Sequence, residues 1–141
     1  MLQHTVSAAD RVLRDAFESK VLAPAAFTHE AHVRLAYVYL AELDVEAAAR
    51  RMRESLLGFL EHNGIPRSKF HETLTHAWIL AVQHFMDKSS CSSADEFVAK
   101  NPELLDSKIM LTHYSAAVLF SADARAALVQ PDVDPIPRRA D

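Results

Sequence analysis

Cysteine is almost absent from this sequence, since Cys91 is the only one among 141 residues. A single cysteine cannot form a disulfide within the chain, so other interactions must hold the fold together. Cys91 lies in the polar run Ser89–Ser93, and nothing adjacent to it in the sequence supplies a base or lowers its pKa. We therefore interpret Cys91 as a loop thiol rather than a catalytic nucleophile.

Long apolar runs and an excess of basic charge are also missing. No apolar run approaches the roughly 20 residues that a membrane span requires, and residues 1–7 do not begin a signal peptide. The 15 Lys and Arg residues are outnumbered by 19 Asp and Glu, and they are scattered rather than gathered into one stripe. These absences predict a cytoplasmic protein that binds neither a membrane nor a nucleic acid.

Glycine is scarce as well, with Gly58 and Gly64 the only two. Valine and isoleucine are too dispersed for the strict alternation of a half-buried strand, so the sequence predicts an all-α fold. A chain of this length can bury a core without help from a metal or a disulfide. We expect one domain, residues 1–130, followed by an extended or disordered tail, residues 131–141, in which prolines recur.

Apolar residues recur at helical spacing in four long segments. These segments predict helices from Ser7 to Phe17, from His29 to Leu43, from Asp44 to Asn63 and from His71 to Met86. Shorter helices are expected after four residues that are typical of helix starts, Ser93, Asn101, Ser115 and Ser121. Ser7 with Asp10, and Ser93 with Glu96, match the capping-box pattern. The pattern favours a bundle of four main helices with short C-terminal helices packed across one end.

Two histidines stand at the start of the second predicted helix. Thr28 is a typical N-cap residue, and His29 and His32 follow it three residues apart, so their rings share one helix face. A helical wheel places both in the same apolar arc as Tyr39. An imidazole on an apolar face costs free energy unless something binds it. We therefore expect both rings to point inward.

A third histidine, His71, opens the fourth predicted helix. The wheel places it beside Trp78 in the middle of the apolar arc, whereas His76 and His84 fall on the polar arc and are set aside. Glu72 lies at the border of the two arcs. It is close enough in sequence to act on whatever His71 binds.

Topology suggests that these residues meet. Short links favour antiparallel neighbours, so the second and fourth helices start at the same level and bring His29 and His32 near His71. Three imidazoles in an apolar pocket match the ligand set of a divalent transition metal such as iron, zinc or nickel. We therefore predict His29, His32 and His71 as metal ligands. Glu72 is a fourth ligand or a general base, and His71 with Glu72 is the expected catalytic pair.

The segments that carry these residues also resemble a pattern of a known family. Phe27-x-His29-x-x-His32, the helix start Phe70-His71-Glu72-Thr73, Asn101-Pro102-Glu103 and Tyr114-Ser115 together resemble a widespread family of small uncharacterised bacterial proteins. The resemblance covers about residues 25 to 131. It implies that His29, His32, His71 and Glu72 act together, and it assigns no activity.

Three functions are compatible with these residues. The first is a metal-dependent enzyme that acts on a small organic substrate as a hydrolase, lyase or oxygenase. The second is a metal-free acid–base enzyme in which His71 is the base and Glu72 or His32 orients it. The third is a non-catalytic helical binding or interaction module with structural histidines. Helix faces that meet a second copy of the chain would make the protein a homodimer. A pocket beside the histidines favours an enzyme, and a sealed, packed arrangement favours the module.

Overall fold

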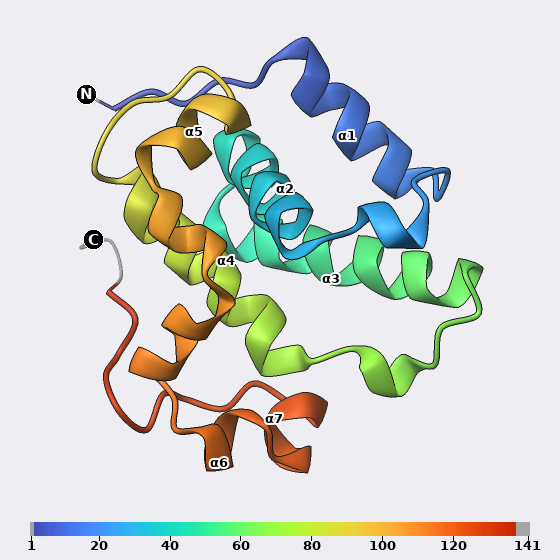
Figure 1. Ribbon diagram of the computed structural model, residues 1–141, viewed down its shortest axis with the longest axis vertical. Helices are drawn as coiled ribbons and strands as arrows, with labels where there is room; N and C mark the ends of the chain where they lie inside the picture. The colour runs from blue at the N-terminus through green and yellow to red at the C-terminus, as the bar shows by residue number, and fades with distance from the viewer. Residues whose placement is uncertain (1, 138–141) are drawn as a thin grey trace.

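The computed structural model describes residues 2–137, and within that range all regular secondary structure is helical. The longer helices are α1 (Ala8–Glu18), α2 (His29–Glu42), α3 (Val45–His62), α4 (Glu72–Met86) and α5 (Ala94–Lys100). Short helices and 3-10 turns complete the chain: η1 (Pro24–Ala26), η2 (Arg67–Lys69), η3 (Pro102–Leu105), η4 (Ser107–Thr112), α6 (Ala116–Leu119) and α7 (Ala122–Ala126). The predicted all-α bundle is confirmed (Figure 1).

Local sequence determines where most helices begin. The Ser7 hydroxyl accepts a hydrogen bond from the amide of Asp10, and the Asp10 carboxylate accepts one from the amide of Ser7, which completes the predicted capping box. Ser93 caps α5 in the same way, but Glu96 accepts from the amide of Ser92 instead of Ser93. In the second predicted capping box, the carboxylate of Glu96 therefore binds the amide one residue before the N-cap residue.

The prediction that Asn101 caps the start of the next helix is wrong. No side-chain cap bond forms at the start of η3, and the Asn101 amide group donates instead to the carbonyl of Phe97, 2.9 Å away. Asn101 thus closes the end of α5 rather than opening the next helix. Pro102 begins a 3-10 turn in place of an α-helix.

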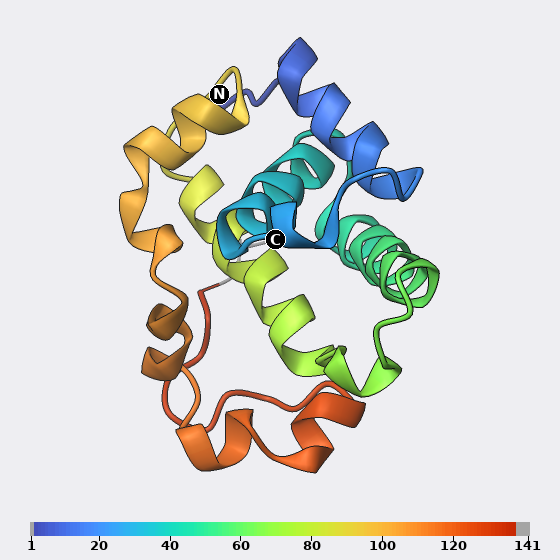
Figure 2. The same ribbon diagram turned by 45° about the vertical axis from the view of Figure 1, so that its right-hand side comes forward.

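Helix α2 is the centre of the core. It contacts α1, α3, α4, α5 and η3, and Figures 1 and 2 show these elements arranged around it. Its buried residues are Ala31, Val33 and all six from Leu35 to Leu40, and they occupy nearly every side of the helix, which is typical of a helix enclosed by others. The Tyr37 ring is fully buried, and its hydroxyl lies 2.8 Å from the carbonyl oxygen of Thr5.

The N-terminal strap, residues 2–6, lies beside the loop before α5. His4 and Cys91 form an isolated parallel bridge, and the Nε2 of His4 donates to the carbonyl of Met86 at 2.7 Å. Cys91 is 4% exposed, and burial raises the pKa of its thiol. A buried thiol held in its protonated form is a poor nucleophile, which agrees with our interpretation of Cys91.

The C-terminal arm, residues 101–137, descends along one side of the bundle and crosses under the start of α4 (Figure 2). Thr73, fully buried in α4, holds this crossing. Its hydroxyl donates to the carbonyl of Ala127 at 2.8 Å and accepts from the amide of Val129 at 2.9 Å. The hydroxyl of Tyr114 donates to the carbonyl of Val129 at 2.6 Å and closes the arm on itself.

Replacing Thr73 with valine is expected to lower the free energy of unfolding by about 1 to 2 kcal/mol, because two backbone groups lose their partner while the shape is kept. Urea denaturation of Thr73→Val against wild type measures this loss. Thr112→Val is the matched control, since Thr112 is exposed and bonds only within its own turn. Equal losses in the two variants would show that Thr73 does not anchor the arm.

The end of the arm, residues 131–137, has no regular secondary structure but contacts the domain. The amide of Val133 donates to the carbonyl of His113 at 3.0 Å, and Ile136 is 5% exposed. The rest of the predicted tail, residues 138–141, lies outside the described residues. No helix within residues 2–137 has the length and apolar character needed to cross a bilayer.

Candidate functional site

His71 is the N-cap of α4, and both of its ring nitrogens are hydrogen-bonded. Nδ1 accepts from the amide of Leu74 at 3.0 Å, and Nε2 therefore carries the proton that it donates to the carbonyl of Leu119 at 2.6 Å. The residue is 8% exposed, and burial together with the nearby Arg125 lowers the pKa of its imidazole. A neutral ring with both nitrogens occupied has no lone pair left for a metal or a substrate proton.

His29 lies at the start of α2, as predicted, and is half-buried. Its Nε2 donates to the carbonyl of Leu104 in η3 at 2.9 Å. The ring packs edge-on against Trp78 of α4, with 4.6 Å between ring centroids. His29 thereby attaches the first part of the C-terminal arm to the bundle, as His71 attaches a later part.

His32 differs from the other two predicted ligands. Its Nε2 is sealed from solvent and has no hydrogen-bond partner among the described residues. The ring lies beside Phe27, with centroids 5.9 Å apart, at the edge of an aromatic cluster that includes Phe17 and Phe59. Burial, with a smaller contribution from the neighbouring His29, lowers the pKa of His32 to about 4.

Glu72 points toward α3 and is engaged there. Its carboxylate accepts from the guanidinium of Arg53 at 2.7 Å, and the same guanidinium lies over the ring of Phe70. The predicted role of Glu72 as ligand or base beside His71 receives no support from this geometry.

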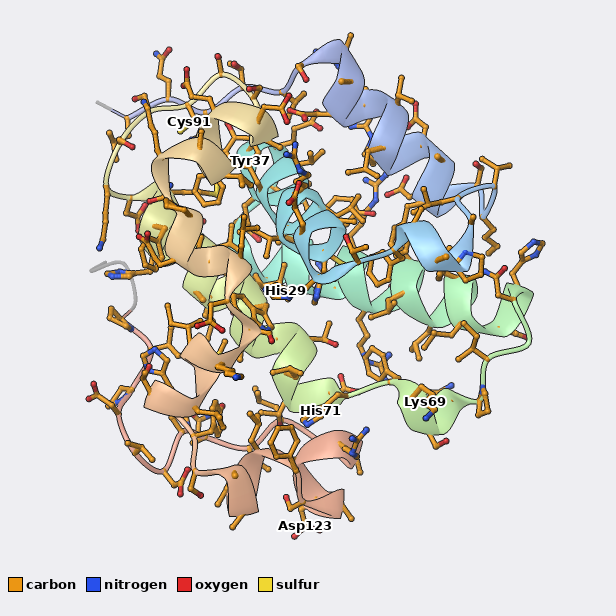
Figure 3. All side chains as sticks on the ribbon, viewed as in Figure 1. His29, Tyr37, Lys69, His71, Cys91 and Asp123 are labelled. Carbon is orange, nitrogen blue, oxygen red and sulfur yellow. The ribbon has the colours of Figure 1, made fainter. Side chains whose placement is uncertain are left out.

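The predicted convergence of the three histidines is not found. Within residues 2–137, no three His, Cys, Asp or Glu side chains are grouped so that they could hold a metal ion. His29 packs on Trp78, which is seven residues after His71, so the two rings contact α4 about 10 Å apart along its axis. Figure 3 shows His29 at mid-height in the bundle and His71 beside α6 and α7.

The start of α2 lies beside the middle of α4 rather than beside its start, because His29 packs on Trp78, the seventh residue of α4. The predicted equal starting levels of the two helices are therefore not found.

A cavity of about 330 Å³ lies between α4 and the C-terminal arm. Six of its lining residues are His76, Ala77 and Leu80 from α4 and Tyr114, Leu128 and Ile136 from the arm. Three prolines of residues 131–137 also line it. We call this the apolar cavity, because aliphatic, aromatic and proline side chains form most of its wall.

A second hollow of about 360 Å³ continues along α4 toward α3. It is lined by Glu46, Ala49, Arg50 and Arg53 of α3 and by Glu72, Thr75 and His76 of α4. We call it the charged hollow. His76 lines both spaces, although its place on the polar arc of the helical wheel had set it aside. The sequence signal for this site is weak, because seven of the ten residues that line the apolar cavity come from parts of the C-terminal arm without helical periodicity.

Comparison of the chain with protein-family models, with curated proteins and with solved structures finds no match.

Proposed function

We propose that this protein is a non-catalytic helical binding module that receives a small apolar molecule in the apolar cavity, with His29 and His71 in structural roles. The observation that carries the proposal is the cavity itself, formed by α4 and the C-terminal arm. Its volume of about 330 Å³ is at the lower end of the range of small-molecule sites. A wall of apolar groups with a few polar ones at its edge is typical of such sites.

The hydrogen bonds of the histidines support the same proposal. His29 and His71 each donate to a carbonyl of the arm, and His71 also caps α4. These bonds hold the arm in place, and the arm provides one wall of the cavity. In this proposal His29, predicted as a metal ligand, and His71, predicted as a metal ligand and catalytic residue, maintain the shape of a binding site that lies elsewhere.

Leu128→Trp tests the proposal, because Leu128 lines the cavity and is 44% exposed, so the larger side chain can occupy the cavity without disturbing the core. We expect n-hexanol, added to wild type, to shift the amide NMR signals of Ala77, Leu80 and Leu128 in a saturable way. The Leu128→Trp variant should bind it at least about tenfold more weakly.

The matched control is Leu111→Trp, at an exposed leucine outside the cavity lining. It should bind hexanol like wild type. Absence of saturable binding to wild type, or equal binding by the two tryptophan variants, would rule out the apolar cavity as the site.

A metal-dependent enzyme remains a prediction, and one observation favours it. The Nε2 of His32 is buried and has no hydrogen-bond partner within residues 2–137, and His29 lies beside it on α2. A bound ion or a water molecule would satisfy that nitrogen. Iron, zinc or nickel bound there would have fewer protein ligands than the three histidines first predicted. Metal content decides between these hypotheses, as described in the Discussion.

Two further predictions stay open. We propose a cytoplasmic location, supported by the single free and buried cysteine, which needs no oxidising compartment. The possible homodimer also stays a prediction.

A further inference from the structure

Five of the ten residues that line the apolar cavity belong to the end segment, residues 130–137. The chain is anchored immediately before this segment, because the amide of Val129 donates to the hydroxyl of Thr73 and its carbonyl accepts from the hydroxyl of Tyr114. In Figures 1 and 2 the end segment, drawn in red, then runs alongside η4. One side of the cavity is therefore closed by a segment that begins at a fixed point.

The composition of the end segment limits its backbone hydrogen bonds. Pro131, Pro135 and Pro137 carry no amide hydrogen, so these three positions cannot donate. The segment has no regular secondary structure. Proline also restricts the backbone to extended conformations, so the segment loses little conformational entropy when it packs on the domain. Such a segment can detach and return while the helices that it covers stay folded.

Hydrogen bonds to the end of η4 and the start of α6 hold the middle of the segment in place. The amide of Val133 donates to the carbonyl of His113 at 3.0 Å, and the ring of His113 donates to the carbonyl of Asp134 at 2.8 Å. The carboxylate of Asp132 accepts from the amide of Ser115 at 2.8 Å. We call these bonds the latch.

The apolar contact of the end segment with the domain depends on Ile136. This residue is 5% exposed, and it is the only buried one among residues 125–137. By contrast, Asp132, Val133 and Asp134 are exposed and do not line the cavity. The latch and the cavity wall are therefore made by different residues, so the latch can be weakened without a change in the wall.

We propose that the end segment is a lid, which opens at the latch before an apolar molecule enters or leaves the cavity. This inference rests on the proposed function and adds the control of access to it. The closed lid supplies part of the cavity wall and retains the ligand. Because the latch bonds do not involve the ligand, the lid controls the rates of binding and release rather than the affinity.

Asp132→Ala tests the lid, because it removes one latch bond and leaves the cavity lining intact. Solvent-exchange NMR on the whole chain measures the protection factor of the Val133 amide, which reports how often the latch opens. We expect this protection factor to fall about fivefold, as for the loss of one exposed hydrogen bond. The dissociation rate constant of n-hexanol, from relaxation-dispersion NMR, should rise about fivefold, while its dissociation constant stays within about twofold of wild type.

Asp134→Ala is the matched control. It removes a carboxylate from the same segment and keeps the backbone bonds of the latch. The protection factor of the Val133 amide and the dissociation rate constant of hexanol should both stay at their wild-type values in this variant.

The outcomes separate the lid from the proposed function. If hexanol binds to wild type and leaves Asp132→Ala at the wild-type rate, although the Val133 protection factor has fallen, the lid is overturned and the apolar site stands. An unchanged Val133 protection factor in Asp132→Ala, or an equal effect of Asp134→Ala, also overturns the lid. If hexanol does not bind saturably to wild type, the proposed function fails and the lid fails with it.

Discussion

Replacing His71 with alanine is expected to lower the free energy of unfolding by about 3 kcal/mol. Three losses contribute about 1 kcal/mol each. The amide of Leu74 loses its N-cap acceptor, the carbonyl of Leu119 loses its donor, and the missing ring leaves a void in a site that is 8% exposed. Far-ultraviolet circular dichroism followed through a urea titration measures the loss.

Two variants make this result specific. His71→Asn keeps an N-cap side chain without reaching Leu119, so it should recover about 1 kcal/mol. His62→Ala, at an exposed histidine of α3, should stay within about 0.5 kcal/mol of wild type. If His71→Ala is as stable as His62→Ala, the ring does not hold the arm.

Metal content of the same proteins tests the competing hypothesis. With His71 in a structural role, protein purified without a histidine tag or chelator should have the same metal content in wild type and in His71→Ala, because this ring has no nitrogen to spare. Near-stoichiometric iron, zinc or nickel in wild type that is lost in a folded His71→Ala variant would establish His71 as a metal ligand. Metal that is kept in His71→Ala and lost in His32→Leu would instead place the ion at His32.

Acid is expected to destabilise the protein by up to about 3 kcal/mol through His32. The pKa of His32 falls from an ordinary 6.5 to about 4 in the folded chain, so the folded state favours the neutral ring. Between these two values the unfolded chain binds more protons, and stability falls as pH falls. At 1.36 kcal/mol for each pH unit, the full difference is roughly 3 kcal/mol. The lowered pKa of His71 acts in the same direction.

The measurement is the free energy of unfolding from urea titrations at several pH values from 7 to 4. His32→Leu should flatten this dependence, because the apolar replacement does not titrate and leaves no unpartnered buried nitrogen. His62→Leu, at an exposed site, should keep the slope of wild type. A slope that is unchanged in His32→Leu would show that another group causes the acid sensitivity.

Much of the secondary structure was predictable, because it depends on neighbours in the sequence. Ser7 and Asp10 satisfy each other's amides within one turn, and Thr28 and Asp44 cap the following helices over equally short distances. Helical periodicity also identified α2 as apolar. Such interactions need no knowledge of the rest of the fold.

The sequence by itself determined the all-α class, the starts of the four long helices and the burial of His71, since each follows from local spacing and apolar periodicity. Only the tertiary structure decided what the histidines bind. The ring nitrogens of His29 and His71 meet carbonyls 75 and 48 residues away, and those carbonyls belong to short helical elements, η3 and α6, of the C-terminal arm. The packing of α2 against the middle of α4 places His29 beside Trp78, away from His71 at the α4 start. Carbonyl groups occur at every residue, so no pattern of residue types indicates which of them a buried imidazole will meet.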